Sequence, residues 1–164
     1  MNFEQVYNDY FGRVYSYIRA RVYNENQSDD ICSEVWQTVF EKQDSFDNEK
    51  GNIEQWLFTI ARNKVNSHFR FYHIKNIFSL SDKEENFPSA EHQPLQELDK
   101  EEDIRQLNAA LGALNPKERD LISLKFFSSL NNREIAAVTS LSESNVGTII
   151  NRAIQKIKTL MEDL

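Results

Sequence analysis

Residues 53–75 gather basic and amide side chains in a chain that is otherwise acidic. They hold four Lys or Arg and two His against one acidic residue, whereas the whole 164-residue chain has a formal charge of -7. Four donors recur there every three or four residues and would line one side of a helix. These are Arg62, Asn66, Arg70 and His73. Such a ridge suits the phosphates of a nucleic acid, although a basic helix face can also be only a solvated surface.

Residues 29–41 show the opposite charge pattern. Apolar side chains recur there at helical spacing, and the acidic and amide groups between them would form an outer face. The preceding Asn26-Gln27-Ser28 is expected to supply the capping residue of this helix. The anionic and the cationic face of such a unit indicate two binding partners, one positively charged and one resembling phosphate.

Three helices would position these two faces. Apolar spacing from Phe3 predicts a first helix of about 20 residues, followed by the acidic helix just described. A polar turn containing Gly51 leads to a third helix from Ile53, whose apolar stripe extends to Tyr72. Trp56 lies on the apolar side of that helix and is expected to pack in the core.

Residues 114–161 follow the pattern of a helix-turn-helix. Asn115 and Asn131 are each followed three residues later by Glu, which is a helix-start signal, and Ser142 would cap a longer final helix. Residues 139–141 would form the turn between the last two helices. The second helix of such a motif lies in the DNA major groove, although an ordinary three-helix bundle has the same spacing.

The acidic total normally argues against a nucleic-acid partner, but the charge is unevenly distributed. Residues 1–75 hold 9 basic and 11 acidic side chains, residues 115–164 hold 7 and 6, and residues 76–114 hold 3 and 9. The middle segment contains Pro88 and Pro94 and lacks regular apolar spacing. We therefore predict an all-α fold with two small helical domains, residues 1–77 and 99–164, joined by an acidic flexible linker at 78–98.

Composition argues against several other classes of protein. The single Cys32 leaves no disulfide framework, and the three His residues share neither metal-ligand spacing nor an evident nucleophile. We expect no catalytic residue, metal or cofactor, and therefore no enzyme. No apolar run reaches the roughly 20 residues of a membrane-spanning helix, so we expect no membrane insertion and a cytoplasmic protein.

Two blocks of the sequence resemble the sigma-70 family of bacterial RNA polymerase sigma factors, in particular its extracytoplasmic-function (ECF) group. Residues 29–70 resemble region 2 of the family, with its Asp-apolar-x-x-Glu core, Phe-Asp turn and Trp-Leu-x-x-Ile-Ala-Arg-Asn helix. Residues 114–158 resemble region 4, with its Glu-Ile-Ala, Ser-Glu and Arg-Ala signposts. The two blocks occur in the family's order, on either side of the acidic segment.

The resemblance implies a protein that binds core RNA polymerase, recognises promoter DNA at about -10 and -35, and helps to open the duplex. Region 2 would dock on the clamp helices of the polymerase β′ subunit and region 4 on the β flap. An extruded base would be captured by the loop before the third helix together with Asn63. Factors of this group are commonly held inactive by an anti-sigma partner, which no residue here identifies.

The site residues follow by matching the family's motifs to this sequence. Core polymerase would contact Asp30, Glu34, Gln37 and Glu41. The -10 element would contact Phe46, Asn48, Lys50, Asn52, Arg62, Asn63, Lys64, Asn66 and Arg70. The -35 element would contact Arg133, Ser144, Asn145, Thr148, Asn151, Arg152 and Lys156.

The chain departs from the family pattern at three places. Many members have basic residues after the Ser-Glu motif where this chain has Gly147 and Ile149, which implies weaker or differently specific -35 binding. Ser140 takes a turn position often held by Gly, and Ser33 replaces a usual Gln. Two other classes remain open: a stand-alone helix-turn-helix regulator that binds DNA as a dimer, and a helical adaptor that binds only proteins.

Overall fold

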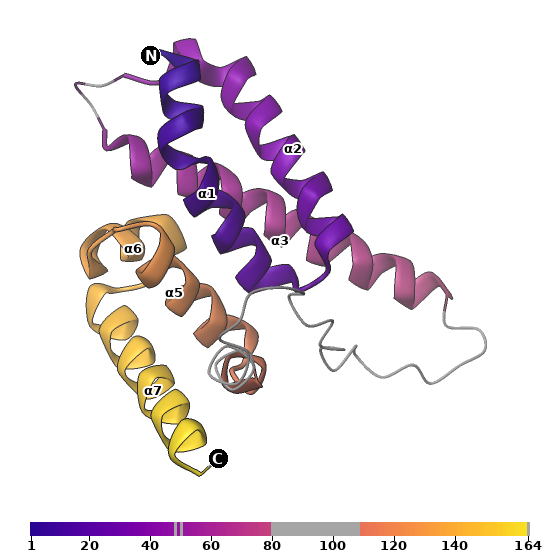
Figure 1. Ribbon diagram of the computed structural model, residues 1–164, viewed down its shortest axis with the longest axis vertical. Helices are drawn as coiled ribbons and strands as arrows, with labels where there is room; N and C mark the ends of the chain where they lie inside the picture. Colours follow the sequence, from indigo (N-terminus) through magenta and orange to yellow (C-terminus); the bar gives the residue numbers. More distant parts are fainter. Residues whose placement is uncertain (48, 50, 80–108, 164) are drawn as a thin grey trace, which may run out of the picture.

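The computed structural model describes residues 1–79 apart from 48 and 50, and residues 109–163; for residues 76–79 it describes the backbone alone. These residues form helices, with no strand among them, which confirms the all-α prediction. Figure 1 shows two lobes that lie against each other. The first lobe contains α1 (Phe3–Val22), α2 (Glu25–Lys42), the 3-10 turn η1 (Gln43–Ser45) and α3 (Ile53–Ser79), and the second contains α5 (Pro116–Phe127), α6 (Asn132–Thr139) and α7 (Glu143–Glu162).

The core of the first lobe lies where α1, α2 and α3 meet. Phe58 is fully buried there and its ring meets the ring of Tyr17 edge-on, with centroids 5.7 Å apart. The apolar stripe predicted from Ile53 does not include Phe58. This side chain is buried nevertheless, because α3 contacts helices on more than one of its sides. Tyr72 was expected in that stripe but is 39% exposed, since it lies beyond the reach of the other two helices. Trp56 is half-buried against the core, so its expected packing is only partial.

The start of α2 lies earlier than we expected, because its capping residue precedes Asn26-Gln27-Ser28. Asn24 is the capping residue, and its side chain accepts a hydrogen bond from the backbone N–H of Gln27. Ser28, which we placed before the helix, is buried within it and donates to the carbonyl of Asn24 at 2.7 Å. The helix begins early because Tyr23 ends α1 in the left-handed conformation, with φ 59°, and reverses the chain within two residues.

The helix starts predicted for the second lobe are confirmed. Asn115 with Glu118 and Asn131 with Glu134 each form a complete capping box, and the Ser142 side chain accepts from the backbone N–H of Asn145. Ser140 caps the C-terminus of α6 at φ 58°, the left-handed conformation in which Gly is favoured. Together, α6, this turn and α7 form a helix-turn-helix.

Replacing Asn115 by alanine should destabilise the second lobe by about 1 kcal/mol, because the backbone N–H of Glu118 loses its acceptor. Chemical denaturation followed by circular dichroism measures this loss. Asn26→Ala is the matched control, since Asn26 is exposed inside α2 and does not cap it. Equal stability of the two variants would show that the capping box does not stabilise α5.

The two lobes share an interface in which α1 packs on α5 and α3 packs on α6. The buried apolar cluster continues through both lobes, so they are not separate in this structure. By contrast, α7 packs chiefly on α5 and α6 and lies on the side away from the first lobe (Figure 1). Nearly all of the expected linker, and the domain boundary at residue 99, lie outside the described residues.

Two expectations from composition can be compared with the described residues. Cys32 is buried in α2 at 4% exposure, and this burial raises the pKa of its thiol to about 11. The helices of the described part include none that is both long and apolar enough to cross a membrane.

Candidate nucleic-acid interface

The outer face of α2 is an open acidic surface. It exposes all four residues predicted to contact polymerase, namely Asp30, Glu34, Gln37 and Glu41. Gln37 donates to the carboxylate of Glu41 at 2.9 Å, whereas the Glu34 side chain is 61% exposed. Glu34 also lies 3.6 Å from the ammonium group of Lys64 on α3, so this ion pair joins the two faces of the first lobe.

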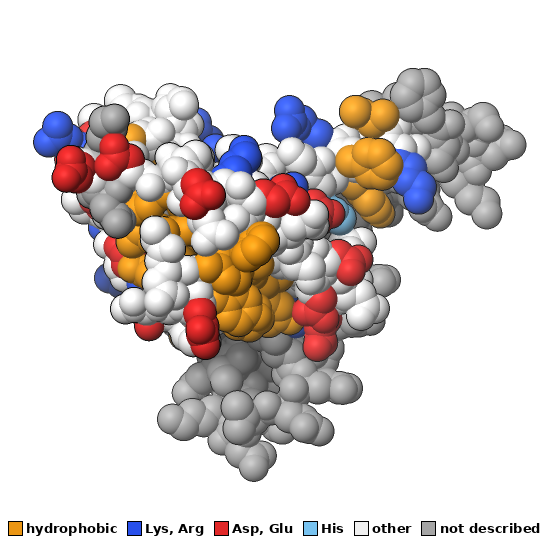
Figure 2. Space-filling view, turned by 90° about the horizontal axis from the view of Figure 1, so that it is seen from above, with side chains coloured by type: hydrophobic (Ala, Val, Ile, Leu, Met, Phe, Trp, Pro, Cys, Tyr) orange, Lys and Arg blue, Asp and Glu red, His pale blue; other side chains and the backbone are white. Residues whose placement is uncertain are grey.

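A cluster of aromatic rings lies beside this acidic face, and we call it the aromatic patch. Its members are Phe3, Tyr7 and Phe11 on α1 and Trp36 and Phe40 on α2, with ring centroids 4.8 to 6.3 Å apart. Three of these rings remain well exposed, the most exposed being Phe40 at 57%. Figure 2 shows hydrophobic side chains gathered on this side of the molecule, with acidic groups around them. The patch was missed from the sequence, although the four-residue spacing of the rings on α1 is a readable signal.

The predicted -10 residues do not form one continuous surface. Asn63 and Arg70 are exposed on α3, and Lys64 faces α2 through its pair with Glu34. The Phe46 ring lies 5.1 Å from the ring of Trp56 and is half-buried, so it does not project freely into solvent. The remaining loop residues of the set, Asn48 and Lys50, lie outside the described residues.

Two other members of the -10 set, Arg62 and Asn52, contact the second lobe, and a third, Asn66, is bonded within the first lobe. Arg62 donates through Nε to Oδ2 of Asp120 on α5, at 2.8 Å. The side-chain amide of Asn52 donates to Glu134 of α6 at 3.1 Å, and Asn66 accepts from Arg21 at 3.1 Å. The donor ridge predicted along α3 is therefore only partly open, because its Arg62 end is covered by the second lobe. Helical spacing within one segment does not reveal such a contact.

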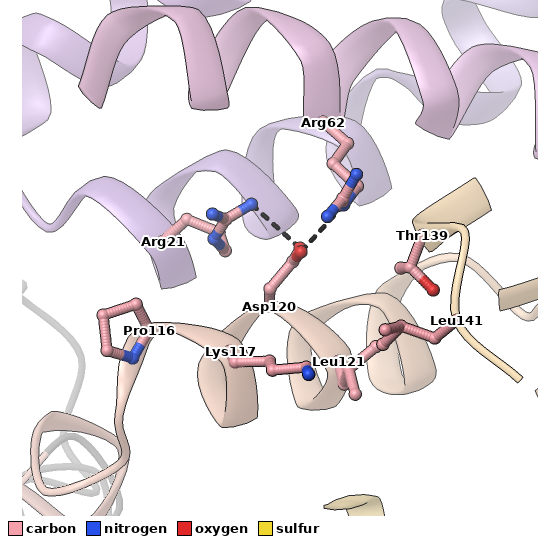
Figure 3. Close-up of a pocket in the computed structure, with 8 residues that line it drawn as sticks. All are labelled: Arg21, Arg62, Pro116, Lys117, Asp120, Leu121, Thr139 and Leu141. Carbon is pink, nitrogen blue, oxygen red and sulfur yellow. Dashed lines mark hydrogen bonds and ion pairs between the residues drawn. The ribbon is translucent and has the colours of Figure 1, made fainter. Parts of the chain in front are cut away.

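Asp120 is the centre of the interface (Figure 3). Its Oδ1 accepts hydrogen bonds from Arg21 at 2.8 Å and from the hydroxyl of Tyr17 at 2.9 Å, while Arg62 occupies Oδ2. Burial raises the pKa of the Tyr17 hydroxyl above its usual range, so this group stays protonated and donates. We call Arg21, Arg62 and Asp120 the clasp. A cleft of about 270 Å³ lies beside it, lined also by Lys117 and Leu141.

The predicted -35 residues lie mostly on open surface. Arg133 on α6 and all six members of the set on α7 are exposed, namely Ser144, Asn145, Thr148, Asn151, Arg152 and Lys156. Lys156 is engaged as well, because its ammonium group donates to Glu118 at 2.6 Å. Burial would raise the pKa of Glu118, but the bonds from Lys156 and from the backbone of Asn115 outweigh it, and this pKa is lowered. Lys156, which was predicted to contact DNA, therefore helps to hold α7 on α5.

The described residues hold no group of three or more His, Cys, Asp or Glu side chains that could bind a metal ion. The helices of the described residues, with a partly open donor surface on α3 and an exposed helix-turn-helix, have the arrangement of helical DNA-binding proteins. Two family models match it: Sigma-70 region 2 over residues 6–72 and Sigma-70 region 4 over residues 104–157. The chain belongs to the sigma-70 family, within its ECF group.

Curated relatives agree with this assignment. The chain is 29% identical to the ECF RNA polymerase sigma factor BldN of Streptomyces coelicolor over 98% of its own length, and the match spans 61% of that protein. It is 24% identical to the ECF RNA polymerase sigma factor SigM of Bacillus subtilis, and this match covers 98% of the chain and 95% of the relative.

Solved structures share the fold. The sigma factor RpoE in complex with the anti-sigma factor NepR from Bartonella quintana matches with a TM-score of 0.73 and 20% identity, covering 98% of this chain and 97% of RpoE. CnrH in complex with the cytosolic domain of CnrY matches with a TM-score of 0.69 and 22% identity, over 98% and 88% of the two chains.

Proposed function

We propose that this chain is a promoter-recognition subunit of RNA polymerase. It binds the core enzyme through the outer face of α2, holds the -10 element through α3 and the preceding loop, and holds the -35 element through α7. The β′ clamp helices and the β flap are its expected polymerase contacts. It acts as a transcription initiation factor rather than an enzyme, and its place of action is the cytoplasm, where the polymerase works.

One observation carries this proposal: a single lobe presents opposite charges on two neighbouring helices. The four polymerase-set residues of α2 are exposed, and Asn63 and Arg70 are exposed on α3, which packs directly on α2. A partner bound to α2 would therefore leave the donors of α3 available to a nucleic acid. Complementary charge speeds the encounter with each partner and fixes its register.

The aromatic patch extends the proposed polymerase surface. Phe40 lies on α2 between the acidic face and the rings of α1, and Phe3 meets it edge-on at 5.3 Å. Aromatic rings are enriched at the centres of protein interfaces, with polar groups around them, and a few such residues supply much of the binding energy. We propose that the polymerase covers both the acidic face and part of this patch.

An inhibitory partner also belongs to the proposal. Two structures with this fold, RpoE and CnrH, were solved with the anti-sigma factor NepR and with the cytosolic domain of CnrY. A protein of the same kind would be expected to compete with polymerase for the surface of α2. The functional boundaries at residues 77 and 99 are part of the same proposal.

Run-off transcription with purified core polymerase on genomic fragments tests the proposed function. The chain is expected to direct transcripts from defined start sites that core polymerase alone does not produce. Absence of such transcripts, together with binding of the isolated chain to duplex DNA as a dimer, would support a stand-alone regulator instead. Absence of both activities would support a protein-binding adaptor.

Arg152→Ala should weaken promoter binding by the assembled polymerase about threefold to tenfold. It should also reduce, by about one, the steepness with which the logarithm of the binding constant falls against the logarithm of salt concentration. Arg152 is exposed on α7, in a set that contains few other cations. Fluorescence titration on a promoter found by run-off transcription measures the effect. Lys158→Ala removes the same charge from an exposed position of α7 outside the set. Equal losses in both variants would contradict a specific contact.

A further inference from the structure

We propose that Asp120 is an internal competitor for nucleic acid, whose carboxylate takes the place of a promoter phosphate on Arg62 and holds the two lobes in a closed, DNA-excluding form. This inference rests on the proposed function, which assigns Arg62 to the -10 element. It concerns a contact within the chain itself.

The chemistry of the clasp supports the substitution. Guanidinium groups bind carboxylates and phosphates through the same N–H donors and with the same charge-assisted geometry. Arg62 directs Nε to Asp120 at 2.8 Å and approaches the carbonyl of Val138 on α6 through Nη1. A phosphate cannot use the same Nε while Asp120 holds it, so closure and strand binding exclude each other at this side chain.

Closure affects one DNA-binding surface more than the other. Arg62 and Asn52 both contact the second lobe, and Asn66 is held by Arg21, which also binds Asp120. The exposed residues of α7 do not face the first lobe, because α7 packs chiefly on α5 and α6. The closed chain therefore covers part of the proposed -10 surface and leaves most of the proposed -35 surface open.

The bonds to the Asp120 carboxylate join one lobe to the other. The three side chains that bind the Asp120 carboxylate, Tyr17, Arg21 and Arg62, all belong to the first lobe. Asp120 is 5% exposed and Arg21 is 6% exposed, so loss of the carboxylate would leave buried positive charge without its partner. A further contact across the interface, from Arg13 to the carbonyl of Phe127 at 3.0 Å, contains no carboxylate of the second lobe.

The test begins with the distance between the lobes in the full chain. Dyes on Asn26→Cys in α2 and Gln155→Cys in α7 report this distance by energy transfer, and buried Cys32 does not compete for the label. Asp120→Asn should raise the ratio of open to closed molecules at least about tenfold relative to the unsubstituted chain. The control Asp29→Asn removes the same charge from a carboxylate that binds Tyr15 within the first lobe. Equal energy transfer in D120N and D29N overturns the proposal.

The second arm measures nucleic-acid binding without polymerase. A fluorescein-labelled single strand of random sequence, about 12 nucleotides long, should bind D120N at least about tenfold more tightly than D29N, because both variants have the same net charge. If D120N opens but gains no affinity, Asp120 is not a competitor and the proposal fails, even where run-off transcription upholds the proposed function. If D120N opens and gains affinity but run-off transcription fails, the competition stands and the promoter role does not.

A loss of fold would show as a loss of helical circular dichroism. In that case Arg21→Gln replaces D120N, because it removes the Arg21 bond to Asp120 and keeps the Arg62 side chain, which can bind the strand once the lobes separate. Like D120N, this variant should lower the energy transfer and raise the affinity for the single strand. An unchanged distance in this variant overturns the proposal as well.

Discussion

Reversing the charge of Glu34 should weaken association with core polymerase at least about tenfold, equivalent to about 1.4 kcal/mol, because a like charge would then face a cationic partner. The side chain is exposed at the centre of the acidic face of α2. Its only partner among the described residues is Lys64 at 3.6 Å, and an exposed pair of this kind adds little to stability. The Glu34→Lys variant should therefore fold normally but bind core polymerase more weakly.

Co-purification of the chain with core polymerase measures this effect, and titration of labelled protein gives the size of the loss. Glu162→Lys makes the same charge change at an exposed position in the last turn of α7, where a cation is favoured by the helix dipole. Unchanged association of the Glu34 variant would remove α2 from the polymerase interface. Equal losses in both variants would indicate a general effect of net charge.

Asn63→Ala should impair promoter opening about 5-fold to 150-fold while duplex binding changes little, because base-edge hydrogen bonds contribute about 1–3 kcal/mol. Asn63 is exposed on α3, one residue past the clasp, so its amide is open to a flipped base in the closed and the open chain alike. Fluorescence of a 2-aminopurine base in the -10 element reports opening.

Asn8→Ala is the matched control for this variant, because Asn8 is an exposed amide on α1, outside the proposed DNA surface. Stability should be unchanged in both variants, since neither side chain packs in the core. If Asn63→Ala reduced duplex binding and opening by the same factor, capture of an extruded base would be refuted.

The parts of the fold that were predicted correctly depend on interactions between near neighbours in sequence. The capping boxes of Asn115 and Asn131 each join residues three apart, so their patterns can be read directly. The start of α2 could not be read in the same way. Asn24 and Ser28 are both capping residues by type, and only burial in the folded lobe shows that Ser28 lies inside the helix.

The interface between the lobes could not be predicted from spacing. Arg62 and Asp120 lie 58 positions apart, and the periodicity of α3 marks Arg62 only as a residue on a polar face. Whether such a face meets solvent, DNA or another lobe depends on how the lobes pack. The exposed sets on α2 and α7 were placed correctly, because a helix with a single apolar stripe turns its other side outward. Their roles in binding stay predictions.

The burial of Cys32 has a consequence for how this protein can be controlled. With a pKa of about 11, only about one thiol in ten thousand is ionised at neutral pH, and the thiolate is the form that reacts with peroxides and disulfides. The sulfur is also shielded by the bundle. Because this is the one cysteine in the sequence, the folded chain offers oxidants no reactive thiol, and a thiol-based response to oxidants would have to begin in another molecule.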